Sequence, residues 1–415
     1  MDSFGPPAAH PASRGDIFMP ARRLLVAALL LPALAACRGT PDYTRPLPPG
    51  TMALRKVTDP LFYPDFAPGF HRQEGLVEAI DHSLAYLAKP SSKQYFPYLD
   101  ISHDRVVRSL HAFKEILGQS VSGTDLHARI LERFDVYESV GWDGSGIVLF
   151  TAYCEPIYDG SLTPSDEFRY PLYRLPPDLV KDAEGKCLGR RQPDGSLAPW
   201  PTRREIEQKG LLKGQELVWL RDPLEVYIVH VQGSGRIRLP NGTELRIGYA
   251  GKTDQPYVSL GKMLIQDGRI REKDMSLPRI KAYFREHPDQ VLEYTYRNPS
   301  YVFFTRREGG PYGSINVPLT PLHSIATDKA VFPRAALAYA VTTLPQGLVQ
   351  PLPFSSFLLD QDTGGAIRSA GRCDIFYGSG PDAELRAGHT QNEGRLYYLF
   401  LKEPADPPKV ASAPR

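Results

Sequence analysis

The stretch Leu359–Gly380, which reads LDQDTGGAIRSAGRCDIFYGSG, places an acidic side chain in the middle of a strand-like run. Period-two alternation over residues 372–377 puts Arg372, Asp374 and Phe376 on one face of that strand. An acid held on a strand beside an aromatic ring is unusual unless it is paired, lies at a surface or takes part in chemistry. The stretch therefore predicts a β-rich region built around one special aspartate.

The composition extends this β-rich prediction to most of the chain. Forty prolines, 35 glycines and 22 tyrosines among 415 residues favour many short strands and turns over long helices. The contents of 42% hydrophobic and 23% charged residues are typical of a globular protein with room for two or three domains. A net charge of +2 without a long basic block argues against a nucleic-acid partner.

Residues 1–36 predict a signal peptide. Two arginines precede an apolar run at Leu24–Leu34, which is too short to span a bilayer comfortably, and translation starts at Met1 or at Met19. The run ends in Leu-Ala-Ala-Cys, which resembles a bacterial lipobox and predicts a lipid-modified Cys37. The alternative is an ordinary secretory signal that happens to end at this cysteine.

The sequence after the cysteine predicts a lipidated tether over residues 37–53, because proline-rich sequence resists compact structure. Several acyl chains on one residue anchor a protein stably, whereas a single chain binds weakly. By resemblance to lipoprotein sorting, Arg38 in place of an aspartate indicates the periplasmic face of the outer membrane. Residues 404–415 are expected to be a disordered tail.

Between Gly75 and Phe134, apolar residues recur every three or four positions and predict packing helices, with an N-cap near Ser102. Thr202 followed by Glu205 is typical of a capping box. Further helices are expected at 278–287 and near 334–340, and strands at 141–160, 224–239, 243–249 and 300–305. Asn241-Gly242 predicts a hairpin turn, and Gly233-Ser234-Gly235 predicts a β-bulge or a close backbone approach.

Most familiar catalytic motifs are missing from the sequence, and we expect no metal or cofactor. Cys37, Cys154, Cys187 and Cys373 form no CxxC pair, and the ten histidines form no HExxH motif. With Cys37 lipidated, the other three cysteines allow at most one disulfide. Gly-Ser-Gly at 233–235 is neither a nucleophile elbow nor part of a P-loop. Carboxylates remain as the candidate catalytic groups.

Three aspartates are candidates. Asp374 is either functional or paired with Arg372 in a surface salt bridge. Asp362, which precedes Thr-Gly-Gly, and Asp328 can each be explained as caps of local turns. A carboxylic acid that must keep its proton near neutral pH needs apolar surroundings, which penalise the charged form. The Phe376 ring and the glycine-rich loop beside Asp374 meet that need.

Many motifs in order resemble the membrane-bound lytic murein transglycosylase A family, whose members are peptidoglycan-cleaving lipoproteins. The matching segments run through nearly all of the chain after the signal: LFTAYCEP at 149–156, FRYPLYRLP at 168–176, VQGSGRIRL at 231–239, GYAGKTDQPYVSLGKMLI at 248–265, NPSYVFF at 298–304, then SIATD, QDTGGAIRSAGRCDIFYGSG and RAGHTQNEGRLYYL. Ala152 and Cys154 depart from the family's more usual Gly-Tyr-Tyr.

The resemblance implies a mainly β fold with N-terminal helices. A double-psi β-barrel domain with three aspartates would be formed by residues 54–156 and 308–403, and a second β-barrel domain would be inserted at 157–307. A groove would separate the two domains and bind the glycan.

The resemblance also implies the reaction: cleavage of the β-1,4 bond between N-acetylmuramic acid and N-acetylglucosamine, with a 1,6-anhydromuramoyl product. Asp374 would be catalytic, and the supporting residues would be Asp362, Asp328, Gly364 and Gly365. The groove residues would be Thr151, Tyr153, Gln232, Gly233, Ser234 and Tyr301. The expected partners are glycan strands, the outer membrane and the cell-wall synthesis or hydrolysis machinery. The alternatives are a noncatalytic glycan-binding lipoprotein and a hydrolytic muramidase.

Overall fold

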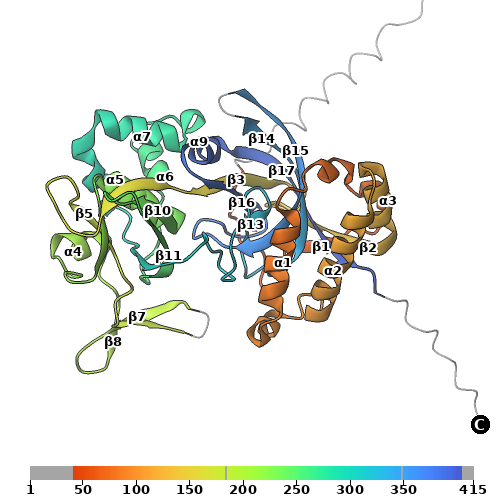
Figure 1. The fold of residues 1–415 in the computed structure, drawn as a ribbon, viewed down its shortest axis with the longest axis horizontal. Helices are drawn as coiled ribbons and strands as arrows, with labels where there is room; N and C mark the ends of the chain where they lie inside the picture. The colour runs from red at the N-terminus through yellow and green to blue at the C-terminus, as the bar shows by residue number, and fades with distance from the viewer. Residues whose placement is uncertain (1–40, 183–184, 347–348, 404–415) are drawn as a thin grey trace, which may run out of the picture. The chain divides into compact units, whose positions relative to one another are not determined.

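The computed structural model describes residues 41–182, 185–346 and 349–403 (Figure 1). The predicted signal peptide, the lipid-modified Cys37 and the tail at 404–415 lie outside the described residues. Within the described residues, no helix is long and apolar enough to cross a membrane.

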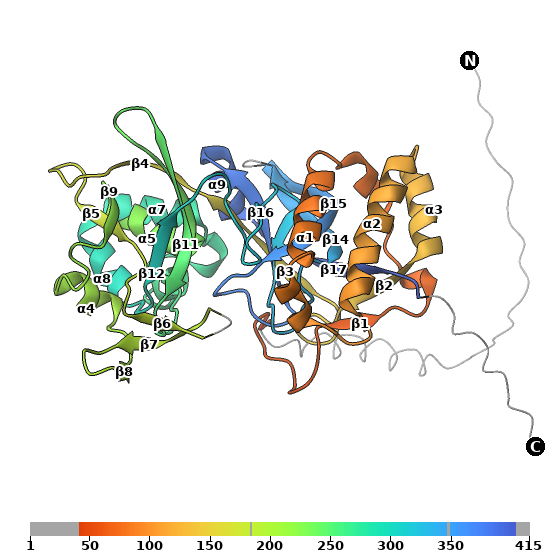
Figure 2. The ribbon, with the colours of Figure 1, turned by 60° about the horizontal axis from the view of Figure 1, so that its bottom comes forward.

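Three helices follow the first strand and lie side by side next to the main sheet (Figures 1 and 2). They are α1 (Leu76–Leu87), α2 (His103–Gln119) and α3 (Gly123–Arg133). The Ser102 side chain accepts a hydrogen bond from the Arg105 N–H and so caps α2, as the sequence predicts. The apolar faces of the helices join the core of the main sheet, so they are packing elements.

The main sheet contains eight strands, in the order β1-β2-β17-β14-β15-β13-β16-β3, and β17 also pairs with β3. A ring is closed by six of these strands, in the order β17-β14-β15-β13-β16-β3, because β17 pairs with β14 and its N-terminal end also pairs with β3. The C-terminal end of β17 pairs with β2. The strands are β1 (Leu54–Lys56), β2 (Phe134–Ser139), β3 (Val148–Glu155), β13 (Ser324–Ala326), β14 (Leu337–Gln346), β15 (Val349–Asp362), β16 (Arg372–Ser379) and β17 (Gln391–Leu401).

A second sheet of six strands is built from residues between β3 and β13, in the order β12-β11-β10-β4-β9-β5. A single bridge between Arg174 and Phe304 joins its two edges. The strands are β4 (Ile157–Ser161), β5 (Tyr170–Tyr173), β9 (Glu216–Leu220), β10 (Ser234–Arg238), β11 (Glu244–Lys252) and β12 (Val302–Arg306). A small sheet contains β6 (Leu179–Lys181), β7 (Cys187–Arg191) and β8 (Leu197–Ala198).

Helices accompany this second sheet and one more precedes the last strand. They are α4 (Arg203–Gln208), α5 (Pro223–Gln232), α6 (Leu260–Gln266), α7 (Leu277–Glu286), α8 (Val291–Tyr296) and α9 (Pro381–His389). Short 3-10 helices occur at η1 (Pro60–Phe62), η2 (Ala67–His71), η3 (Pro90–Tyr95), η4 (Glu272–Asp274) and η5 (Pro288–Gln290). The predicted capping box of Thr202 and Glu205 is present at α4, and the predicted Asn241-Gly242 turn joins β10 to β11.

The strand predicted at 224–239 is wrong in its first half, which is helix α5. The Asp222 side chain caps the helix and Pro223 occupies its first position, a combination that favours helix over strand. The helix is largely buried, with Leu224 and residues 226–230 in the core, so its sequence also shows strand-like alternation. Gly233 is not a bulge: it ends α5 with a φ of 76°.

The helix predicted near 334–340 is also wrong, because β14 begins at Leu337 and pairs with both β15 and β17. Alanine favours helix only weakly, and burial between two strands overrides that preference. Helix α9 is absent from the predictions, although Pro381 at its start and acidic residues in its first turn are typical helix signals.

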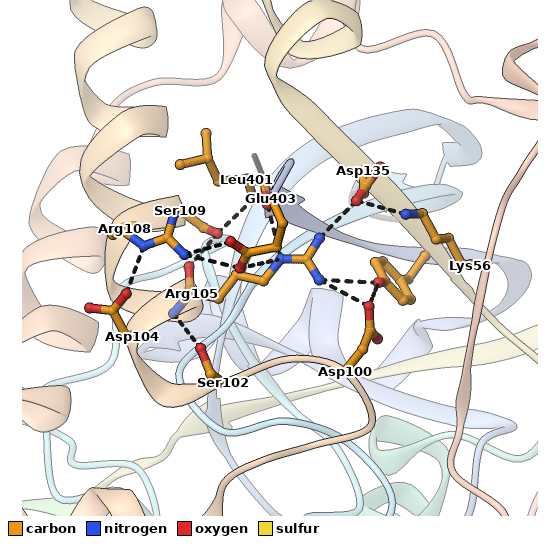
Figure 3. Close-up of polar contacts among 11 residues, drawn as sticks. Lys56, Asp100, Ser102, Asp104, Arg105, Arg108, Ser109, Asp135, Leu401 and Glu403 are labelled. Carbon is orange, nitrogen blue, oxygen red and sulfur yellow. Dashed lines mark hydrogen bonds and ion pairs between the residues drawn. The ribbon is translucent and has the colours of Figure 1, made fainter. Parts of the chain in front are cut away.

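The buried guanidinium of Arg105 joins helix α2 to the end of the main sheet (Figure 3). The side chain is 2% exposed. It donates to the Leu401 carbonyl at 2.9 Å, to Asp135 at 2.8 Å and to Asp100 at 3.1 Å. Because each contact lies on a different segment, this one cation fixes the helical layer to β2 and β17.

The described part of the predicted tether lies against the main sheet. The Tyr43 hydroxyl donates to Glu393 at 2.5 Å, and its ring packs edge-on against Trp142 at 5.9 Å. Leu47 and Met52 contact the apolar core. Residues 42–53 therefore form part of the folded body.

Candidate active site

Strands β3 and β16 pair in parallel, and this register builds the centre of the candidate site. Asp374 lies opposite Thr151, and Phe376 lies opposite Tyr153. Asp374 is mid-strand, as the alternation predicts, and is half-buried. Cys373 and Ile375 point to the opposite face and are fully buried in the core. A rigid sheet thus holds one carboxyl group at the boundary between core and surface.

The Thr151 hydroxyl donates a 2.7 Å hydrogen bond to Asp374 Oδ1. Arg372 Nη2 donates in turn to Thr151 Oγ1 at 3.0 Å. Burial raises the pKa of Asp374 to about 6, against the opposing effects of the Thr151 hydrogen bond and the Arg372 charge, while nearby Asp362 adds to the rise. Asp374 can therefore both hold and release a proton near neutral pH.

Asp362 ends β15 and has donors on both of its oxygens. Tyr153 donates its hydroxyl to Oδ2 at 2.7 Å, and the backbone N–H groups of Ser314 and Thr363 donate to Oδ1 at 2.8 Å each. Burial raises the pKa of Asp362, and these donors oppose that rise. The expected turn cap is present, but the Tyr153 contact also ties Asp362 to the strand beside Asp374.

Asp328 is buried and organises the loop between Asp362 and Asp374. Its Oδ2 accepts from the Ser369 N–H at 2.8 Å, and its Oδ1 accepts from the Ala330 N–H at 3.1 Å. The second contact is the local cap that the sequence suggests. The first contact fixes Ser369, whose φ of 66° is uncommon for a residue other than glycine.

A buried ion pair on the main sheet, absent from the sequence predictions, lies next to this site. Lys329 Nζ contacts Asp360, and the two side chains are 5% and 0% exposed. Thr327 and Tyr398 donate hydroxyls to Asp360 at 2.8 and 2.7 Å. Burial lowers the pKa of Lys329, although Asp360 and Asp362 favour its charged form. The positive charge of Lys329 therefore stabilises the Asp362 carboxylate and opposes the rise in the pKa of Asp362.

Two family descriptions match the chain. The MltA specific insert domain matches residues 149–305, and the 3D domain matches residues 323–400. The membrane-bound lytic murein transglycosylase A of Vibrio cholerae is 35% identical over 269 residues, which cover 63% of this chain and 68% of the relative. The Escherichia coli K12 protein of the same name is 33% identical over 270 residues, 64% of this chain and 69% of the relative. The chain belongs to the membrane-bound lytic murein transglycosylase A family.

Solved structures of this family have the same fold. A membrane-bound lytic murein transglycosylase from Agrobacterium tumefaciens matches 84% of this chain and 98% of its own, with a TM-score of 0.71 and 29% identity. The E. coli MltA structure with bound chitohexaose matches 88% of this chain and all of its own, with a TM-score of 0.67 and 25% identity. The mainly β family fold with accompanying helices is therefore confirmed.

The other residues expected at the site of this family member fall into two groups. Gln232 ends α5, and its Oε1 accepts from the Cys154 N–H on β3 at 3.3 Å, so it lies beside the strand of Thr151. Gly233 ends α5 directly after Gln232, and Ser234 starts β10. Tyr301 does not lie with these groove residues. It is 1% exposed, and its ring centre lies 4.6 Å from that of His230 in the core.

The two glycines of the loop after Asp362 differ in their surroundings. A Cβ at Gly364 would lie 2.9 Å from Ile367 Cγ1, so a larger residue would disturb the turn, whereas Gly365 is exposed with open space around it. Cys154, Cys187 and Cys373 are all buried free thiols. Among the described residues, no cluster of histidine, cysteine or acidic side chains could hold a metal ion.

Proposed function

We propose that Asp374 is the acid and base of a peptidoglycan lytic transglycosylase reaction. The chain's family and the chitohexaose-bound relative identify the substrate class as a β-1,4-linked glycan and the activity as lytic transglycosylation. The observation that carries the role of Asp374 is its place in the β3–β16 pairing, where the Thr151 hydroxyl holds the carboxyl group at 2.7 Å and burial raises its pKa to about 6.

The reaction proceeds in two proton transfers through the same carboxyl group. Protonated Asp374 gives its proton to the oxygen that links N-acetylmuramic acid to N-acetylglucosamine, and the C1–O bond breaks. The Asp374 carboxylate then removes the proton from the muramoyl C6 hydroxyl, whose oxygen bonds to C1. The product is a 1,6-anhydromuramoyl end, no water is consumed, and Asp374 is protonated again.

One carboxyl group suffices because the nucleophile belongs to the substrate. A hydrolase needs a second carboxylate that attacks the sugar or activates water. Asp362 is poorly suited to either task, since three donors already occupy its two oxygens. Its role is to hold Tyr153 and the loop, and its negative charge helps Asp374 to keep a proton.

The surrounding residues position the glycan. Thr151 and Tyr153 line the strand beside Asp374, and Gln232, Gly233 and Ser234 approach that strand from α5 and β10. Ala152 and Cys154 depart from the usual family sequence, and Cys154 is buried next to α9. The glycan therefore contacts the Thr151 and Tyr153 side of β3.

We also propose a two-domain architecture and a lipid anchor for this chain. The closed six-stranded ring is consistent with a double-psi barrel formed by residues 54–156 and 308–403, and the second sheet with an inserted barrel domain at 157–307. The glycan groove would separate the two domains. The lipobox-like sequence at Cys37 supports a lipid anchor at the periplasmic face of the outer membrane of a Gram-negative bacterium.

Mass spectrometry of purified sacculi digested with the protein tests the reaction. We expect soluble muropeptides that end in 1,6-anhydromuramic acid. Reducing muramic acid ends would indicate a hydrolase instead, and binding to sacculi without soluble products would indicate a noncatalytic glycan-binding protein.

A further inference from the structure

A cavity of about 270 Å³ lies between the end of α1, the 3-10 helix η3 and the loop at 313–317. Its lining includes Lys89, Tyr86, Tyr95, Ser314 and Arg334. None of its nine lining residues is acidic, whereas two are cationic. The cavity therefore presents positive charge together with polar hydrogen-bonding groups.

The Arg334 guanidinium is held in place without an acidic partner. Its Cζ atom lies 3.9 Å from the centre of the Tyr95 ring, a cation–π contact that restrains the side chain. Within the described part of the chain, neither Arg334 nor Lys89 takes part in an ion pair. A guanidinium that is already oriented and has no counter-charge is suited to bind a planar carboxylate through two parallel hydrogen bonds.

The cavity is next to the proposed catalytic centre. Ser314 lines the cavity, and its backbone N–H donates a hydrogen bond of 2.8 Å to Asp362 Oδ1. The N–H of neighbouring Ile315 donates a hydrogen bond to the Gln361 carbonyl. The loop that forms one wall of the cavity is therefore the loop that holds Asp362. A substrate group in the cavity would lie close to the glycan bound at Asp374.

We propose that this cavity binds a carboxylate of the peptide attached to the muramic acid residues of peptidoglycan. The inference rests on the proposed function, which places the glycan beside Asp374. The glycan's sugar rings carry no anion, whereas the attached peptides carry free carboxylates. An extended peptide covers about 3.3–3.6 Å per residue, so two or three residues reach roughly 7–11 Å from the glycan.

The test measures binding separately from turnover. In the Asp374→Asn background, isothermal titration calorimetry compares two soluble probes, a muropeptide with free peptide carboxylates and the same muropeptide with those carboxylates converted to amides. We expect the probe with free carboxylates to bind about tenfold more tightly, in line with one charge-assisted contact. Arg334→Gln and Lys89→Glu should each reduce that preference and leave the affinity for the amidated probe unchanged.

A matched control is Lys93→Glu, because Lys93 is exposed on η3 but does not line the cavity. The Lys93→Glu variant should keep the difference in affinity between the two probes. Equal affinities of the two probes for the parent protein, or a preference that survives Lys89→Glu, would overturn the inference. Lys89 is exposed, so its replacement gives an answer even if Arg334→Gln disturbs the fold. Failure of the proposed function would be seen separately, as a wild-type protein that releases no anhydro product.

Discussion

Thr151 and Asp374 lie opposite each other in the parallel pairing of β3 and β16, and the Thr151 hydroxyl donates to the Asp374 carboxyl group at 2.7 Å. The two residues are 223 positions apart in the chain. The ring of strands therefore holds the proposed catalytic group on one strand and its hydrogen-bond donor on the neighbouring strand.

Replacing Asp374 with asparagine should abolish the release of anhydro-muropeptides. The amide keeps the size and a hydrogen-bonding oxygen but cannot transfer the proton, and general acid–base catalysis typically contributes about 10²–10⁴-fold to the rate. The measurement is the initial rate of soluble product release from sacculi, with circular dichroism as the control for folding. An Asp374→Asn protein that folds and retains more than a tenth of the rate would remove Asp374 from the proposed role.

The same substitution should stabilise the protein near neutral pH. The pKa of Asp374 is raised in the folded state from 3.8 to about 6, so the folded protein holds this proton more tightly than the unfolded chain. Ionisation then costs folding free energy as pH rises from about 4 to about 6, by about 1–3 kcal/mol for a half-buried group.

Thermal melting at two pH values measures this effect. Relative to wild type, the Tm of Asp374→Asn should be higher by a few degrees at pH 7.5 and about equal at pH 4. A variant that is less stable than wild type at pH 7.5 would contradict the proposed shift in pKa.

Thr151→Val should move the alkaline limb of the profile of kcat/KM against pH to higher pH. The Thr151 hydroxyl stabilises the Asp374 carboxylate, so its loss raises the pKa of Asp374 above about 6 and keeps the proton-donating form at higher pH. The maximum of kcat/KM should fall by about tenfold, the equivalent of one hydrogen bond to a charged group. Valine has the shape of threonine, so the strand remains intact.

The control for this prediction is Thr151→Ser, which keeps the hydroxyl. Its alkaline limb should coincide with that of wild type in the same assay. If the limbs of the valine and serine variants coincide, the hydroxyl does not tune the proton affinity of Asp374.

The sequence predicts the strand of Asp374 correctly because a period-two pattern is a local property. The same rule fails at 223–232, where an apolar, largely buried helix shows strand-like alternation and only the Asp222 cap and Pro223 indicate a helix. The pairing of Asp374 with Thr151, and the burial of Asp360 behind Asp362, depend on strands that are distant in sequence. No local pattern encodes them, so the strand position of Asp374 could be predicted from its own segment, whereas its pairing with Thr151 could not.

The buried pair of Lys329 and Asp360 should be costly to break from one side. Lys329→Met leaves the Asp360 charge at 0% exposure with only hydroxyl donors from Thr327 and Tyr398, and removal of one partner of a buried pair typically costs about 3–5 kcal/mol. Urea denaturation measures the loss. The double variant Lys329→Met/Asp360→Asn removes both charges and should recover part of the stability.

If the double variant is no more stable than Lys329→Met, an uncompensated carboxylate is not the cause of the loss.

Activity adds a second readout, because Lys329 lowers the pKa of Asp362. Without that cation Asp362 binds a proton more readily, and its protonated form does not repel the charge on Asp374. The pKa of Asp374 should then fall, and the alkaline limb of the pH profile should move to lower pH.

Arg105 and Arg108 offer a matched comparison on helix α2. Arg105 is 2% exposed and donates to Leu401, Asp135 and Asp100, whereas Arg108 is 38% exposed and pairs with Asp104 and Glu403. Arg105→Met should destabilise the protein by about 1–3 kcal/mol, because Asp135 keeps its ion pair with Lys56 while the Leu401 carbonyl loses its donor and the helical layer loses its link to β2 and β17. Arg108→Met should cost less than about 1 kcal/mol, since exposed ion pairs contribute little. Chemical denaturation of both variants decides the point, and similar losses would show that the buried guanidinium does not hold the helices to the barrel.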